Sequence, residues 1–92
     1  MRYSPPKATD LQTLKNDLQR TGEEMADLFG VAGGQQWRKY TGGDSPREIS
    51  PHILFFAMAR LELDDAMIDR VLNRMRQVGA TIDLAAGGEP EQ

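Results

Sequence analysis

The chain has 92 residues, with 11 Lys and Arg, 14 Asp and Glu, one His and no Cys. This length suits one domain with a modest core. Without Cys there is no disulfide scaffold, thiolate zinc site or thiol nucleophile, and one His is too few for a multi-imidazole metal site. The net charge of −3 argues against a protein that coats nucleic acid regardless of sequence, because such proteins are usually basic.

Several other classes of protein are excluded by missing patterns. No apolar run approaches the ~20 residues of a membrane span, and the first six residues lack the apolar core of a signal peptide, so we expect a cytoplasmic location. No paired carboxylates in a plausible cleft, nucleophile with a His partner, Walker motif or dinucleotide-binding motif is present. We therefore expect no enzyme activity, no catalytic residue, no cofactor and no metal site.

The N-terminal half of the chain predicts an extended lead-in and three helices. Residues 1–8 contain two prolines and form the lead-in. A helix over 9–20 is predicted to start with Thr9 as its cap. Thr21 begins a second, two-turn helix that ends at Gly30. A third short helix follows over 34–41, and two glycines end it.

The C-terminal half predicts two further helices. Ser50, followed by proline, signals a helix over 51–62, which is apolar nearly all round and is expected to be the most buried. Asp64 caps a fifth helix over 65–78, and residues 80–92 form a flexible acidic tail. No alternating pattern indicates a strand. The prediction is an all-α, compact five-helix bundle over residues 9–79.

The second and third helices have the features of a helix-turn-helix motif. Such a motif needs a small residue in its first helix, which Ala26 supplies, and a residue tolerant of positive φ at the turn, which Gly30 supplies. Trp37 and Tyr40 provide apolar anchors on one side of the second helix. Its other side carries four long hydrogen-bonding residues: Gln35, Gln36, Arg38 and Lys39.

At this point the chain resembles the lambda-repressor-like (Xre-type) helix-turn-helix family, over about residues 10–63. The resemblance is carried by residues 11–14, 21–31, 37–43 and 46–51 in this order and spacing. There are two departures. Gly22 stands where the family usually has a Gln that helps to hold a phosphate, and the turn is one residue longer. An insertion within 32–34 places Trp37 and Tyr40 inward and avoids burying Gln36 without partners.

The resemblance implies a transcription regulator that binds double-stranded DNA, with the third helix in the major groove. Gln35 and Gln36, with Arg38 and Lys39, are the implied base-reading residues, although the two cations could instead pair with phosphates. The implied phosphate contacts are Thr21, Gly34, Thr41 and Arg47. One module of this size buries ~600–1,000 Å² on DNA, so we expect a homodimer that binds two half-sites.

Two alternatives remain open at this stage. The chain could instead be a protein-interaction module, antitoxin-like or accessory, that binds a partner through the fifth helix or the tail. Within the fifth helix, Met67, Ile68, Leu72 and Met75 fit either a dimer face or the last wall of the core. The charge does not decide between the functions, because residues 1–82 carry 11 acids and 11 bases, whereas the third helix has two cations and no acid.

Overall fold

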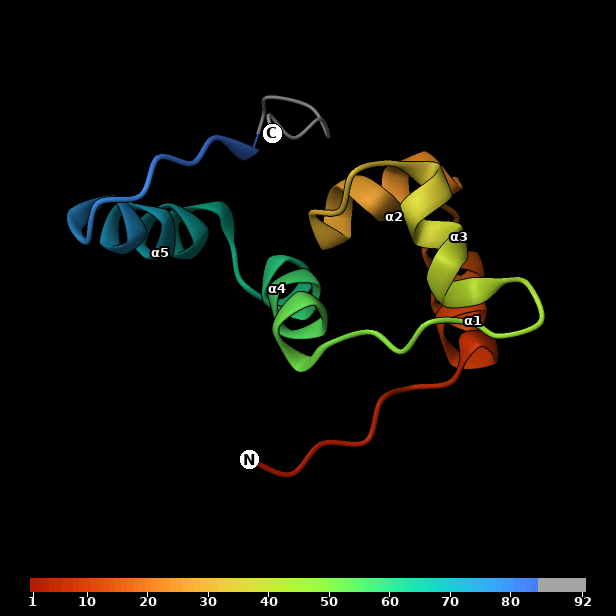
Figure 1. Ribbon diagram of the computed structural model, residues 1–92. Coiled ribbons are helices and arrows are strands. Elements are labelled where there is room, and N and C mark those ends of the chain that lie inside the picture. Colours follow the sequence, from red (N-terminus) through yellow and green to blue (C-terminus); the bar gives the residue numbers. More distant parts are fainter. Residues whose placement is uncertain (85–92) are drawn as a thin grey trace.

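The computed structural model describes residues 1–84, and this part of the chain forms five α-helices without a strand (Figure 1). In chain order they are α1 (Ala8–Leu18), α2 (Gly22–Phe29), α3 (Gly34–Thr41), α4 (Pro51–Glu62) and α5 (Asp65–Gln77). The all-α prediction is confirmed. None of these helices is long and apolar enough to cross a membrane. Residues 85–92 of the predicted acidic tail lie outside the described residues.

The first helix starts and ends earlier than predicted. Thr9 is already inside α1, and its carbonyl accepts a hydrogen bond from the Thr13 hydroxyl, so the predicted Thr9 cap is wrong. The cap position is Lys7, whose backbone N–H donates to the Asp10 carboxylate at 2.9 Å. An acid in the first turn also suits the positive end of the helix dipole. Gln19 ends α1 in the left-handed conformation with φ 55°.

The predicted starts of the later helices are confirmed where a side chain caps the first turn. Thr21 and Glu24 form a reciprocal capping box, with N···O distances of 3.1 and 2.8 Å. The Ser50 hydroxyl accepts from the Ile53 amide, and the Asp64 carboxylate accepts from the Met67 amide. These contacts fix the helix starts because each satisfies an amide with no partner inside its own helix.

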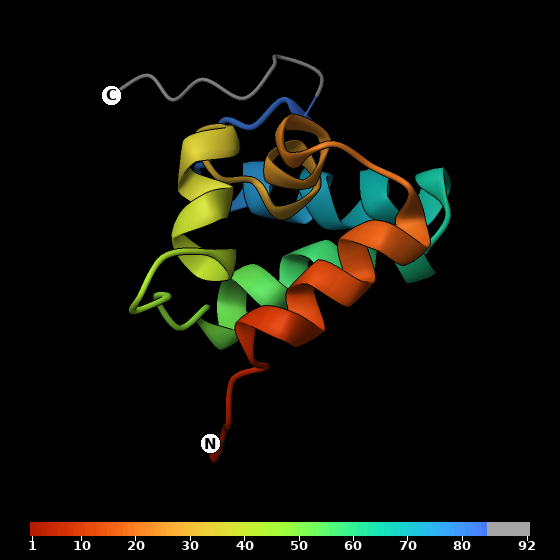
Figure 2. The same cartoon turned by 90° about the vertical axis from the view of Figure 1, so that its right-hand side faces the viewer.

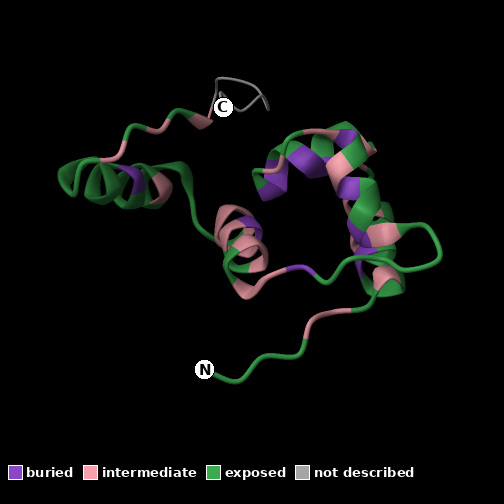
Figure 3. Ribbon diagram, viewed as in Figure 1, coloured by how far each residue is buried: buried purple, intermediate pink, exposed green. Residues whose placement is uncertain are grey.

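The core is centred on α2 rather than on α4 (Figure 3). Met25, Ala26, Leu28 and Phe29 of α2 are all buried, whereas only Ala57 of α4 is. Phe55 remains 76% exposed. The prediction that 51–62 is the most buried helix is therefore wrong. Helix α4 packs mainly on α2, and α5 stands apart, so the remaining sides of α4 are only partly covered (Figure 1).

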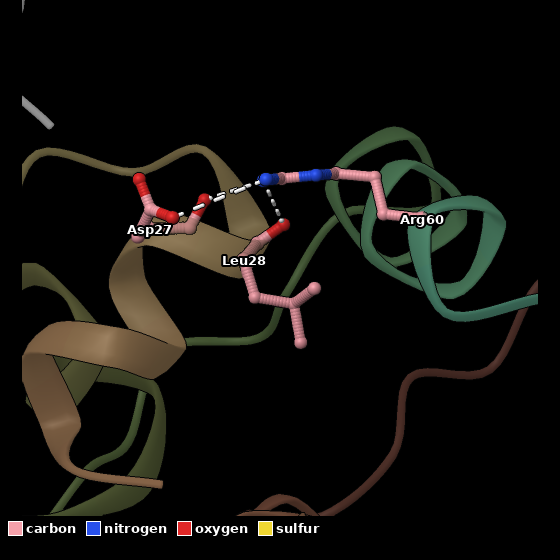
Figure 4. Close-up of polar contacts among 3 residues, drawn as sticks. All are labelled: Asp27, Leu28 and Arg60. Carbon is pink, nitrogen blue, oxygen red and sulfur yellow. Dashed lines mark hydrogen bonds and ion pairs between the residues drawn. The ribbon is translucent and has the colours of Figure 1, made fainter. Parts of the chain in front are cut away.

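Arg60 of α4 binds the C-terminal end of α2 (Figure 4). The Arg60 guanidinium donates to the backbone carbonyls of Asp27 at 2.7 Å and Leu28 at 3.0 Å. It also pairs with the Asp27 carboxylate at 3.9 Å and lies over the Phe56 ring. Because the last carbonyls of a helix lack partners and carry partial negative charge, this cation satisfies the end of α2.

The N-terminal lead-in is attached to the segment before α4. The Tyr3 hydroxyl donates to the Ile49 carbonyl at 2.7 Å, and Ile49 itself is buried. Partial burial, and then the negative charge of Glu48, raise the pKa of Tyr3 above its ordinary value of 10.0. The lead-in therefore holds the backbone at the point where the chain enters α4.

Candidate functional site

The candidate site is built on α2, the turn over residues 30–33, and α3. Gly30 ends α2 with φ 71°, and a Cβ at this position would lie 2.9 Å from the Phe56 ring. The Val31 amide then donates back to the Ala26 carbonyl at 3.0 Å. Glycine is therefore required at position 30 for its backbone conformation and for the close approach of α4.

Two aromatic anchors fix the rotation of α3 against α2. Trp37 is 1% exposed and Tyr40 is 9% exposed, so both face the core. The ring centroids of Trp37 and Phe29 are 5.0 Å apart with a tilt of 51°, which is a favourable aromatic geometry. The expected inward placement of Trp37 and Tyr40 is confirmed. Because the Trp37 Nε1 has no hydrogen-bond partner, packing alone holds the indole.

A carboxylate from α2 caps the start of α3. Gly33 occupies the cap position and has no side chain, so α3 lacks a local cap. The Glu23 Oε2 instead accepts from the Gly34 amide at 3.0 Å. A Cβ on Gly34 would lie 2.8 Å from that oxygen. Glycine at position 34 thus leaves room for Glu23, which ties the first turn of α2 to the first turn of α3.

The anchors leave the opposite side of α3 facing solvent. Gln35, Arg38 and Lys39 are exposed, and Gln36 is half-buried. All four residues that sequence analysis assigned to base reading therefore lie on the outside of one short helix. Gln36 is half-buried and therefore less accessible than the other three.

The loop after α3 brings another cation to this surface. The Arg47 amide donates to the Lys39 carbonyl at 2.7 Å, so the loop folds back at the C-terminal end of α3 (Figure 2). Arg38, Lys39 and Arg47 line one open groove together with Gln35 and the carboxylate-bearing Asp44. We call this set of five residues the α3 groove. It holds three cations and one acid, although the described chain as a whole is close to neutral.

The other predicted phosphate contacts already have partners within the chain. The Thr21 amide donates to Glu24, and the Gly34 amide donates to Glu23. Both acceptors are carboxylates, which would repel a phosphate at the same position. The Thr41 hydroxyl is directed to the Trp37 carbonyl at 3.5 Å. Of the four predicted phosphate contacts, only Arg47 therefore presents an exposed cationic group at the α3 groove.

Sequence reasoning missed Glu23 and Asp44 as members of this region. Glu23 is eleven residues from the amide that it caps, beyond the reach of a capping pattern. The one available signal is that the start of α3 consists of two glycines, neither of which can supply a cap. The place of Asp44 in the groove depends on the path of the loop after α3.

Comparisons with protein families, with curated proteins and with solved structures find no match for this chain. Within residues 1–84, no group of three or more His, Asp or Glu side chains could hold a metal ion.

Proposed function

We propose that the protein is a sequence-specific double-stranded DNA-binding regulator whose α2–turn–α3 unit acts as a helix-turn-helix motif. The observation that carries this proposal is the α3 groove, in which amide and guanidinium side chains share the exposed side of a helix whose other side is anchored in the core. A rigidly held helix with such a face fits the major groove of B-DNA.

The side chains of α3 divide by their chemistry. The Gln35 amide can donate to and accept from adenine in parallel, a pairing worth ~1–3 kcal/mol of discrimination, and Gln36 has the same chemistry with less exposure. Arg38 and Lys39 reach guanine or the adjacent phosphates, and Arg47 in the loop pairs with a phosphate. Glu23 positions the start of α3 and does not itself contact a phosphate.

The near-neutral charge of the remaining protein shapes this binding mode. Phosphate attraction supplies most non-specific affinity, and here it comes from the three cations of the α3 groove. A single module then binds weakly away from its site. Useful affinity requires base contacts and two copies on two half-sites, so we propose a homodimer as the DNA-binding form.

Selection from random duplexes, followed by gel shifts on the selected sequence, tests the proposal. We expect Gln35→Ala to relax preference at one base position, and Arg47→Ala to weaken binding to all duplexes. Arg47→Ala should also reduce the salt slope by about one. Lys7→Ala, which removes an exposed cation outside both the α3 groove and α5, is the matched control and should leave base preference and salt slope unchanged.

The alternative is a protein-interaction module on the same scaffold. The observation that favours it is the exposed apolar surface of α5, described below, together with the acids Glu23 and Glu24 at the start of α2. Absence of duplex binding at low salt, with recovery of a protein partner, would replace the DNA proposal with this one.

A further inference from the structure

Helix α5 and its C-cap residue carry a row of apolar side chains that the described residues 1–84 leave partly exposed. Met67, Val71, Met75 and Val78 are 41%, 49%, 36% and 81% exposed. Their spacing of four, four and three residues places them on one face of the helix. We call these four residues the α5 stripe. The stripe also lines the apolar-walled groove that runs along the helix, flanked by Arg70 and Arg74.

The attachment of α5 to the rest of the molecule uses a different face. Leu72 is the only buried residue of α5, and Ile68 is half-buried. The two residues are four apart, so they share a face, and both line the pocket that Leu28 and Leu61 form with α5. The structure thus separates the two readings left open by the sequence: Ile68 and Leu72 face the core, and Met67 and Met75 do not.

Charge along α5 is divided between its two halves. Residues 64–69 carry three acids (Asp64, Asp65 and Asp69) and no base. Residues 70–78 carry three bases (Arg70, Arg74 and Arg76) and no acid. An antiparallel copy of the same helix would place acidic halves beside basic halves and oppose the two helix dipoles, whereas a parallel copy would place like charges together.

We propose that the α5 stripe is a homodimer interface, in which α5 of a second copy packs antiparallel about a two-fold axis near Val71. This places Val71 against Val71 of the second copy, and Met67 against Met75 of the second copy, so one patch complements itself as an isologous interface requires. The inference deepens the proposed homodimer, but it stands on the surface of α5 and does not depend on DNA binding.

Sedimentation equilibrium of the full chain over a concentration series, without DNA, tests the dimer. We expect a reversible monomer–dimer equilibrium, and we expect Val71→Glu to weaken it by roughly tenfold or more because a charge enters the centre of the interface. Phe55→Glu adds the same charge at an exposed apolar residue of α4, outside α5, and should leave the equilibrium unchanged. Circular dichroism checks that both variants fold. A wild-type chain that stays monomeric, or equal effects of the two variants, would overturn the proposal.

Cysteine cross-linking tests the antiparallel arrangement, because the chain has no cysteine of its own. A mixture of Met67→Cys and Met75→Cys chains should form the mixed disulfide under mild oxidation, and Val71→Cys should cross-link to itself. Preferential 67–67 and 75–75 cross-links would indicate a parallel pair and overturn the arrangement. Failure of the DNA-binding proposal is a separate result, seen as loss of duplex binding by a chain that still dimerises.

Discussion

The Glu23 carboxylate of α2 accepts a 3.0 Å hydrogen bond from the Gly34 amide in the first turn of α3. This contact joins the N-terminal ends of the two helices on which the proposed DNA contact depends. It also accounts for two consecutive glycines at the start of α3, since Gly33 leaves the cap position without a side chain and Gly34 leaves space for the carboxylate.

Replacing Glu23 should destabilise the fold through α3. We expect Glu23→Ala to lower the free energy of unfolding by ~1 kcal/mol, the usual cost of losing an N-terminal cap, and Glu23→Gln to lower it less because an acceptor oxygen remains. Urea unfolding measures both changes. The Gln variant also shows whether the charge itself matters: equal losses for Gln and Ala would mean that the hydrogen bond alone does not account for the effect.

The effect of Gly34→Ala on stability should depend on which residue occupies position 23. In the wild-type chain the new methyl group would lie 2.8 Å from the Glu23 Oε2 and would displace the cap, which offsets the gain in helix propensity. In the Glu23→Ala background that conflict disappears, and Gly34→Ala should raise the free energy of unfolding by roughly 0.5–1 kcal/mol. A double-mutant cycle of the two substitutions measures this coupling. Additive effects would contradict the contact.

Gly22 offers a way to strengthen DNA binding. A Cβ at position 22 would lie 3.7 Å from the Trp37 ring, which is ordinary van der Waals contact, so a β-carbon is accepted there. Because the Thr21 amide at this end of α2 already donates to Glu24, a phosphate contact here needs a side-chain donor; we expect Gly22→Gln to supply one and to raise duplex affinity several-fold through about one new hydrogen bond. Gly22→Ala is the control for helix propensity. If both variants bind alike, the N-terminus of α2 does not approach the DNA.

Removing Arg60 should loosen α4 from α2. Arg60→Ala leaves the Asp27 and Leu28 carbonyls without the guanidinium, and hydrogen bonds to a charged group are worth ~1.5–3 kcal/mol each. Because the side chain is 21% exposed and water replaces part of the loss, we expect a cost of about 1–2 kcal/mol. Thermal and urea unfolding give the value. Arg60→Lys keeps the charge but not the fork, and should recover only part of the stability.

The raised pKa of Tyr3 predicts a loss of stability at alkaline pH. Since its pKa is raised in the folded protein, the folded state holds the phenol proton more tightly than the unfolded state. The stabilising contribution is therefore complete below pH ~10 and is lost as the pH rises through the raised pKa. Unfolding measured from pH 8 to 11 should show this loss in the wild-type chain and a smaller loss in Tyr3→Phe. Identical curves would exclude Tyr3 as the source.

Local signals predicted the helices well because their causes are local. The Thr21 and Glu24 box, Ser50 and Asp64 each act within one turn, and the structure has them where the sequence indicated. At the start of α1, however, the predicted cap was Thr9, whereas the residue at the cap position is Lys7. The Asp10 carboxylate selected Lys7, which carries no recognisable capping side chain.

Features that depend on distant segments were not predictable in the same way. The apolar composition of α4 predicted deep burial, but burial needs partners on every side, and α5 does not provide them. At the candidate site, the composition of α3 indicated which residues face outward. The Glu23 cap and the return of Arg47 to Lys39 depend on the path of the backbone over eight residues or more, which no short pattern encodes.

Trp37 is an intrinsic fluorescence probe of the contact between α2 and α3. It is the only tryptophan in the chain, and it is packed against Phe29 without a polar partner for its indole nitrogen. Its emission should be blue-shifted in the native state and should move to the red when α3 separates from α2. Because α5 lies apart from α3, melting of α5 should change the far-ultraviolet dichroism and leave the fluorescence unaltered (Figure 1). Two probes on one sample can therefore resolve whether the last helix melts before the rest of the protein.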